Sequence, residues 1–159
     1  MITDPARRGR ALAEFYLRLA PRLFDEIVES GLLPPGHGGA APDPARAEWN
    51  CFALYACVRG LVAAGGFNRE TAAAIDALHE AALEPGDAAS RALASERYAE
   101  YGAIGQEGGA SGATTVGQRL GEAAARHLAR EPAPALVELV GALHEALAEG
   151  AAEAVRRGE

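Results

Sequence analysis

Three histidines stand in three different predicted helices, and imidazole is a common protein ligand for transition metals. At 100° per residue, His79, His127 and His144 each fall beside apolar residues of their own helix. If the three imidazoles converged, they would bind a divalent transition metal and leave a coordination position for water or substrate. Asp76 precedes His79 by three residues, which is the carboxylate–histidine spacing of one half of a di-iron site.

The alternative is a set of separate, neutral, hydrogen-bonded histidines, and we favour it because intermediate burial is common for this residue. The carboxylates needed for a di-iron site are missing, since Ala124 and Gly141 stand three residues before His127 and His144. No HExxH motif occurs either. We therefore predict no cofactor, and a divalent transition metal is the alternative.

The pentapeptide Ala-Leu-His-Glu-Ala occurs twice, at residues 77–81 and 142–146. Each copy carries one of the histidines and lies within an amphipathic predicted helix. Short matches arise by chance in a chain with 38 alanines, so we interpret them as coincidence rather than as an internal duplication.

A glycine-rich loop near residues 102–114 is the second candidate site. Its backbone N–H groups, the hydroxyls of Ser111, Thr114 and Thr115, and the start of the following helix would together hold an anion or another small molecule. No predicted strand precedes the segment and it contains no lysine, which excludes a phosphate-binding P-loop. A plain connection between two helices is the simpler interpretation.

Two tyrosines end the helix predicted before this loop. Tyr98 and Tyr101 are three residues apart and share a helix face. They would either form a binding rim beside the loop or anchor the end of the helix in the core.

Helices carry the histidines and tyrosines and flank the glycine-rich loop, because apolar residues recur at helical spacing and no stretch alternates as a half-buried strand would. Asp4, Asp43, Asn68, Asp87 and the Thr115–Gln118 pair are predicted caps. A Pro/Gly-rich loop is expected near residues 31–43. We predict an all-α, single-domain bundle of about six helices, at 5–30, 44–64, 69–84, 88–102, 116–130 and 135–156.

The second predicted helix is apolar on almost every side, which is typical of a helix in the middle of a bundle. Arg59 is the exception. We expect its guanidinium to pair with an acidic residue or to stack on Tyr55, one turn earlier.

Composition limits the possible functions of this chain of 159 residues. Its net charge of −7 and its lack of lysine argue against nucleic-acid binding, which requires a basic surface.

The apolar run from Cys51 to Phe67 is too short for a membrane span, and no signal peptide precedes the first helix. Cys51 and Cys57 have the wrong spacing for a mutual disulfide, which agrees with a predicted cytoplasmic location.

No catalytic motif is present, so the sequence does not favour an enzyme. We predict a non-catalytic binding or regulatory helical module that acts through a protein partner or self-association, with a homodimer as one form. The alternatives are a metal-binding protein or metal-dependent enzyme that uses the histidines, and a small-molecule or anion site at the glycine-rich loop.

Overall fold

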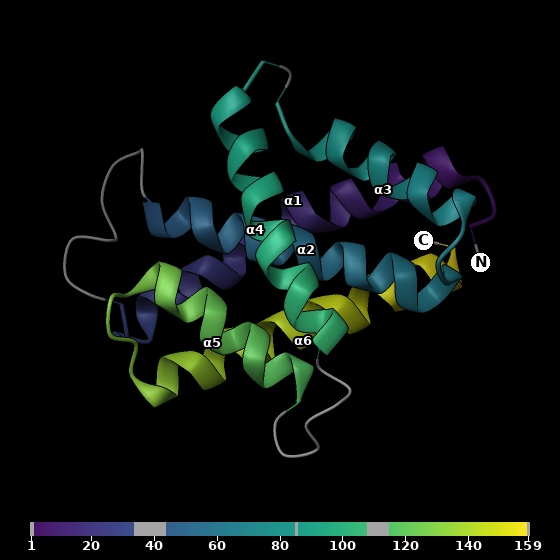
Figure 1. Cartoon of the computed structure of the whole chain (residues 1–159). Helices are drawn as coiled ribbons and strands as arrows, with labels where there is room; N and C mark the ends of the chain where they lie inside the picture. Colours follow the sequence, from purple (N-terminus) through teal and green to yellow (C-terminus); the bar gives the residue numbers. More distant parts are fainter. Residues whose placement is uncertain (1, 34–43, 85, 108–114, 159) are drawn as a thin grey trace.

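The computed structural model describes residues 2–33, 44–84, 86–107 and 115–158, and within these ranges it contains helices and no strand (Figure 1). This confirms the predicted all-α bundle. No helix in these ranges is both long and apolar enough to cross a membrane. The helices are α1 (Pro5–Glu29), α2 (Pro44–Gly65), α3 (Arg69–Ala82), α4 (Ala88–Glu107), α5 (Val116–Leu128) and α6 (Pro134–Arg157).

Local capping chemistry sets the starts of most helices, as the sequence predicts. The clearest case is a reciprocal capping box at α5, in which the Gln118 N–H donates to the Thr115 hydroxyl and the Gln118 side chain accepts from the Thr115 N–H. The predicted cap Asp43 lies outside the described residues. The capping side chains that form are Asp4 for α1, Asn68 for α3, Asp87 for α4 and Thr115 for α5.

The α4 helix is longer than predicted and ends at Glu107 rather than near Gly102. Residues 102–107 of the predicted glycine-rich loop are therefore helical. Packing explains the difference, because Tyr101 is fully buried and Ile104 packs against the core one turn later, and such burial outweighs the low helix propensity of glycine. Residues 34–43 and 108–114 of the two predicted loops lie outside the described part of the chain.

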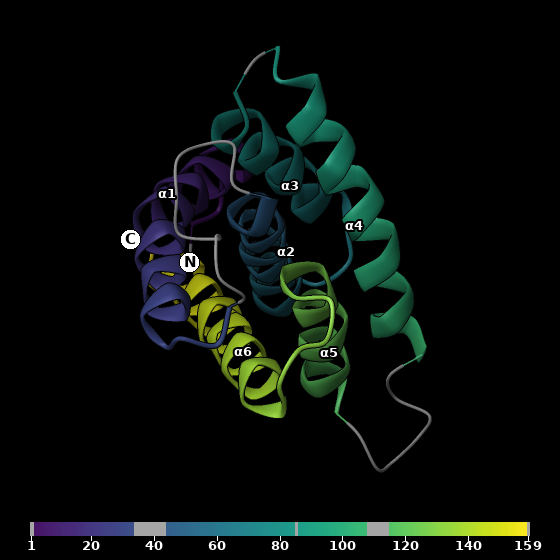
Figure 2. The same ribbon diagram turned by 90° about the vertical axis from the view of Figure 1, so that its left-hand side faces the viewer.

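The α2 helix occupies the middle of the bundle and contacts all five other helices, as Figure 2 shows. Trp49, in the first half of α2, is fully buried. Its indole N–H donates to the Ala20 carbonyl of α1 at 2.9 Å. The Trp49 ring also packs edge-on against Phe52. These contacts confirm that the helix with apolar residues on almost every side is central.

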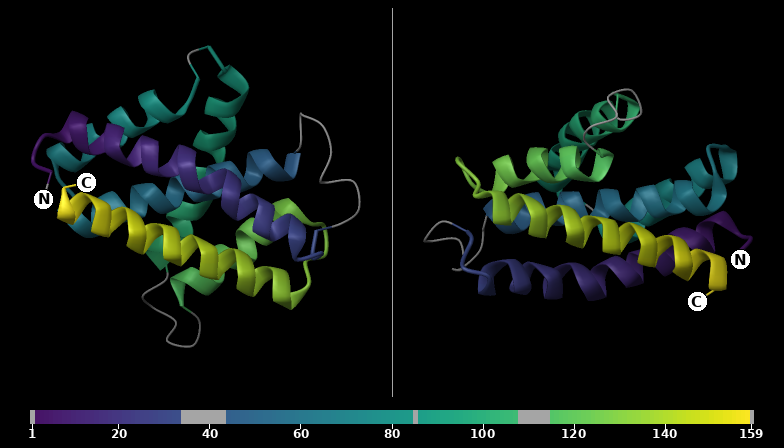
Figure 3. Two further views of the ribbon diagram at one scale, coloured as in Figure 1. Left: turned by 180° about the vertical axis from the view of Figure 1, so that it is seen from behind. Right: turned by 90° about the horizontal axis from the view of Figure 1, so that it is seen from below.

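The two ends of the described chain lie side by side (Figure 3). The Ile2 N–H donates to the Val155 carbonyl of α6 at 3.1 Å. Arg8 of α1 is buried, and its guanidinium donates to the Ile2 carbonyl at 2.9 Å and to the Thr3 carbonyl at 3.3 Å. The segment before α1 is thus fastened to both terminal helices.

Glycines allow the most tightly packed helices to approach each other. A methyl group placed on Gly60 of α2 would lie 2.6 Å from the Ala151 Cβ and 2.8 Å from the Ala148 carbonyl oxygen, both on α6. Gly9 of α1 similarly faces the backbone of α3 at Ala74. The bundle is therefore closely packed around small residues, as expected for an alanine-rich core.

We expect Gly60→Ala to lower the free energy of unfolding by about 1–3 kcal/mol, because the new methyl group would overlap α6. Gly102 is the matched control, since a methyl group there would have no neighbour within 4 Å. Gly102→Ala should stabilise the protein by up to about 1 kcal/mol through helix propensity alone. Urea denaturation of both variants measures this, and equal stability of Gly60→Ala and the wild type would contradict the proposed packing.

Candidate functional site

The three histidines predicted as metal ligands each have a different set of neighbours. His79 of α3 makes a hydrogen bond with the Tyr98 hydroxyl of α4 at 2.9 Å, and His127 of α5 binds Glu100 of α4 at 2.7 Å. His144 of α6 is fully buried. Within the described ranges, no group of three or more histidine, cysteine, aspartate or glutamate side chains is arranged to bind a metal ion. The shared metal site therefore remains a prediction that no observed geometry supports.

His79 and Asp76 remain close to each other on α3. Burial lowers the pKa of His79, and the nearby charge of Asp76 partly offsets this effect. His79 and Tyr98 also line a small cavity of about 270 Å³ between α3 and α4. Because the imidazole already binds the Tyr98 hydroxyl, we interpret this pair as a link between two helices.

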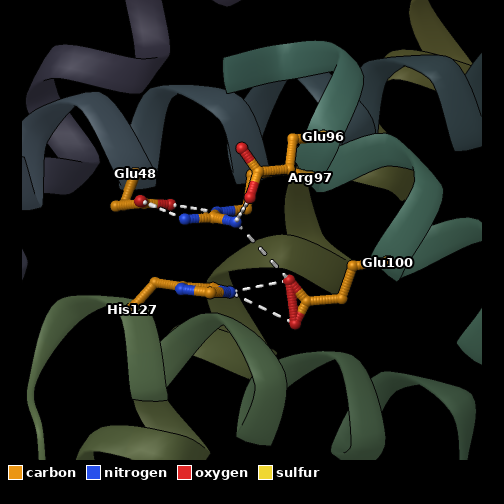
Figure 4. A network of polar contacts seen from close by, with 5 residues as sticks. All are labelled: Glu48, Glu96, Arg97, Glu100 and His127. Carbon is orange, nitrogen blue, oxygen red and sulfur yellow. Dashed lines mark hydrogen bonds and ion pairs between the residues drawn. The ribbon is translucent and has the colours of Figure 1, made fainter. Parts of the chain in front are cut away.

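A chain of polar contacts joins α2, α4 and α5 (Figure 4). Arg97 of α4 binds both carboxylate oxygens of Glu48 of α2, at 2.7 and 2.8 Å. Both side chains are largely buried, with exposed fractions of 14% and 13%, and this geometry gives a strong, directional ion pair. One turn later, Glu100 binds His127. The two pairs are linked through Arg97 and Glu100, which approach to 4.0 Å, and they hold α4 against α2 and α5.

The two tyrosines predicted either as a binding rim or as an anchor of the helix hold α4 against α2. Tyr101 is fully buried, and its ring packs against Phe52 and Tyr55 with centroid distances of 5.1 and 5.6 Å. Tyr98 is partly buried and packs against Tyr55 at 5.3 Å. Both therefore anchor the helix, which was the other role that the sequence allowed.

His144 is the most unusual residue of this aromatic cluster. Its ring stacks on Phe52 with a centroid distance of 4.0 Å, and neither ring nitrogen has a hydrogen bond that meets ordinary distance and angle limits. Burial, reinforced by the charge of Arg59, lowers the pKa of His144 to about 3. The side chain is therefore neutral at physiological pH, and it contributes packing rather than charge.

The two cysteines are buried free thiols, as the sequence predicts. Burial raises the pKa of Cys51 to about 11 and that of Cys57 to about 12. The thiolate is the nucleophilic form of cysteine, so neither residue is suited to catalysis at neutral pH.

Thr115 is the described member of the predicted anion site, and Ser111 and Thr114 lie outside the described residues. Thr115 lines a cleft of about 760 Å³ between α5 and α6, but its hydroxyl already caps α5. Three carboxylates also line this cleft, against one cation, Arg59. This excess of negative charge does not favour an anion. The carboxylates are Glu122, Glu138 and Glu145.

A second cavity of about 760 Å³ lies over a partly buried stripe of α2, and we call it the α2 groove. α3 and α4 form its walls, and Figure 1 shows these two helices diverging from the turn that joins them. The groove is mostly apolar, and its volume is within the range of small-molecule sites. Its lining residues are Tyr55, Val58, Arg59, Val62, Ala63, Phe67, Asn68, Thr71, Ala72, Ile75, Gly102, Gly105, Gln106 and Val116.

Glycines on α4 keep the α2 groove open. A methyl group on Gly102 would have no neighbour within 4 Å, and one on Gly105 would have only the Tyr55 hydroxyl, at 3.9 Å. Beyond Tyr101, Gly102 and Gly105 therefore leave space above α2, and Gln106 is the one residue with a side chain that α4 contributes to the lining. Packing holds the first part of the helix in place, while its last turns leave a cavity.

The α2 groove was not predicted from the sequence, although one signal was present. Tyr55, Val58, Arg59 and Val62 have the spacing i, i+3, i+4, i+7, so they form one stripe of α2. A single arginine in this stripe indicates a side that is not packed against another helix. The predicted pairing of Arg59 with an acidic residue is confirmed by its contact with Glu145.

Comparisons of this chain with protein-family models, with curated proteins and with solved structures find no match. A functional interpretation therefore depends on the geometry described above.

We expect His144→Phe to preserve or raise the free energy of unfolding at pH 7, because it removes two ring nitrogens that lack hydrogen bonds. The wild type should also lose stability relative to the variant in acid. Below the ordinary pKa of 6.5 the unfolded chain binds a proton at His144, whereas the folded chain does so only near pH 3. Stability therefore falls as the pH falls through this window, by up to about 1.4 kcal/mol per pH unit.

Urea denaturation of both proteins between pH 4 and 7.5 measures this difference. A gap between variant and wild type that does not change with pH would show that His144 has an ordinary pKa in the folded protein.

Proposed function

We propose that this protein is a binding module that holds one small apolar molecule in the α2 groove. The observation that supports the proposal is an apolar cavity of about 760 Å³ above the central helix. Val58, Val62 and Ile75 line it, and each is only partly buried. An apolar ligand that covered these side chains would remove their surface from water, which favours binding.

The position of the groove also supports a binding role. Its floor belongs to α2, which contacts the other five helices. A preformed cavity loses little conformational entropy when a ligand binds. Apolar residues form most of the lining, and a few polar groups accompany them, as in ligand sites where such groups orient an otherwise apolar molecule.

A second candidate function is self-association, and one exposed residue favours it. Phe67, in the turn between α2 and α3, has 93% of its surface exposed. An aromatic side chain that is buried in a partner can contribute strongly to an interface. A homodimer that uses this turn would bring two α2 grooves close together.

The binding proposal is tested with N-phenyl-1-naphthylamine, a neutral apolar dye whose fluorescence rises when it leaves water. We expect the wild type to bind one dye molecule per chain. Gly105→Leu should weaken binding by about tenfold or more, because its side chain would fill the cavity without replacing a packed residue. Ala99→Leu is the matched control, since Ala99 is an exposed residue of α4 outside the groove lining.

The control should bind the dye as the wild type does, and circular dichroism should show equal helix content in all three proteins. Equal dye binding by Gly105→Leu and the wild type would contradict the assignment of the site to the α2 groove.

Self-association is measured separately by size-exclusion chromatography with light scattering. We expect a dimer at high micromolar concentration in the wild type and a monomer in Phe67→Ser, because the substitution removes the exposed ring. A wild-type monomer under these conditions would contradict the dimer, and it would leave the small-molecule proposal unaffected.

A further inference from the structure

We propose that the ligand of the α2 groove is a single-chain amphiphile with a carboxylate head, and that Arg59 and Tyr55 bind this head. This inference rests on the proposed function of the groove and adds the chemical class of its ligand. It follows from the charge, the unused donors and the shape of the lining.

Charge is the first argument. Arg59 is the only charged residue among those that line the groove. Its side chain is 27% exposed, so its guanidinium is partly removed from water. A single cation in an apolar cavity complements a molecule with one anionic group and an apolar body.

Unused hydrogen-bond donors are the second argument. The Arg59 guanidinium binds Glu145 through Nη1, and its Nε and Nη2 groups have no partner within the described residues. Arginine has five N–H donors in a planar fork that matches a carboxylate. Arg59 can therefore accept a second carboxylate from the side of the groove.

Tyr55 provides a second donor one turn earlier on the same face of α2. Its hydroxyl lies near Gly105, on the α4 wall of the groove, and it has no hydrogen bond to the part of the chain that the structure describes. Burial raises the pKa of Tyr55, so the phenol keeps its proton at neutral pH. Tyr55 and Arg59 would thus donate to the same ligand head.

Glu145 competes with the ligand for Arg59. Its side chain is 45% exposed, and exposed ion pairs contribute little to stability because water solvates both charges. A ligand carboxylate can therefore share or replace this contact at little cost. The competition makes a specific prediction, because removing the charge of Glu145 should strengthen ligand binding rather than weaken it.

The apolar body of the ligand would lie along Val58 and Val62 on α2 and against Ile75 on α3. Small residues complete the opposite wall, so the space is an open channel beside the arginine. A single alkyl chain fits this shape, and it needs no polar partner along its length.

The test measures displacement of N-phenyl-1-naphthylamine by dodecanoate, by the neutral dodecanol and by the cationic dodecyltrimethylammonium. The two ions are used below their critical micelle concentrations and dodecanol below its solubility limit. We expect dodecanoate to bind the wild type about tenfold more tightly than dodecanol, and the cation to bind most weakly. Arg59→Gln should remove the preference for dodecanoate, so that dodecanoate and dodecanol bind with similar affinity. Arg18→Gln is the matched control on an exposed site of α1, and it should behave as the wild type.

Two further variants keep the test informative if Arg59→Gln fails to fold. Tyr55→Phe should reduce the preference for dodecanoate by about threefold, which is the loss of one hydrogen bond. Glu145→Gln should increase dodecanoate affinity by a similar factor and leave dodecanol affinity unchanged.

Equal affinity of the wild type for dodecanoate and dodecanol would overturn the carboxylate preference and leave the apolar groove as proposed. A preference that persists in Arg59→Gln would overturn the role of this residue. Binding to phosphatidylglycerol vesicles without binding to monomeric dodecanoate would overturn a free amphiphile as the ligand. Failure of the dye itself to bind would instead contradict the proposed function.

Discussion

The central position of α2 depends on how closely α6 can approach it, and Gly60 sets that distance. Any side chain at this position would meet Ala151 and the backbone of α6. Close approach in turn places the aromatic residues of α2 against the partners that they need, as in the stack of Phe52 on His144 of α6. A wider spacing would leave voids around these rings, and voids in a packed core are costly. The large aromatic residues of the core can thus pack closely only because small residues such as Gly60 let the helices approach each other.

The same tight packing isolates polar groups inside the core. His144, the Tyr101 hydroxyl and the Thr71 hydroxyl have no hydrogen-bond partner within the described ranges, and each such group opposes folding. The strong polar contacts lie nearer the surface, where Arg97 joins Glu48 and Glu100 joins His127. Close packing of apolar side chains therefore stabilises the interior, whereas ion pairs fix the position of α4 at the edge of the bundle.

The position of α4 explains why the α2 groove exists. Tyr98 and Tyr101 press one part of this helix onto α2, and Gly102 and Gly105 follow them directly with no side chain to fill the adjoining space. One turn of α4 thus packs against α2, and the next turn leaves the space of the groove. The open turns expose Arg59, whose charge also lowers the pKa of the buried His144. A ligand at the groove would consequently contact the edge of the same aromatic cluster that stabilises the fold.

Sequence alone determined the helices, because their limits depend on neighbours along the chain. Asp4, Asn68 and Thr115 cap helices through contacts three residues away, and the apolar periodicity between caps requires no knowledge of the fold. It also identified α2 as central and Arg59 as paired. The end of α4 was predicted too early, since the burial of Tyr101 by α2 cannot be read from its glycine-rich surroundings.

Tertiary structure alone decided the environment of each side chain. The pentapeptide Ala-Leu-His-Glu-Ala shows this directly, because its two copies have the same local sequence and the same helical backbone. In α3 its histidine is partly buried and binds Tyr98, whereas in α6 it is fully buried and stacks on Phe52. Which residues lie opposite a helix depends on segments far away in the chain, and the groove over α2 depends on the same long-range packing. Local sequence therefore fixes where a helix begins and which faces it has, and only the packed fold fixes what each face meets.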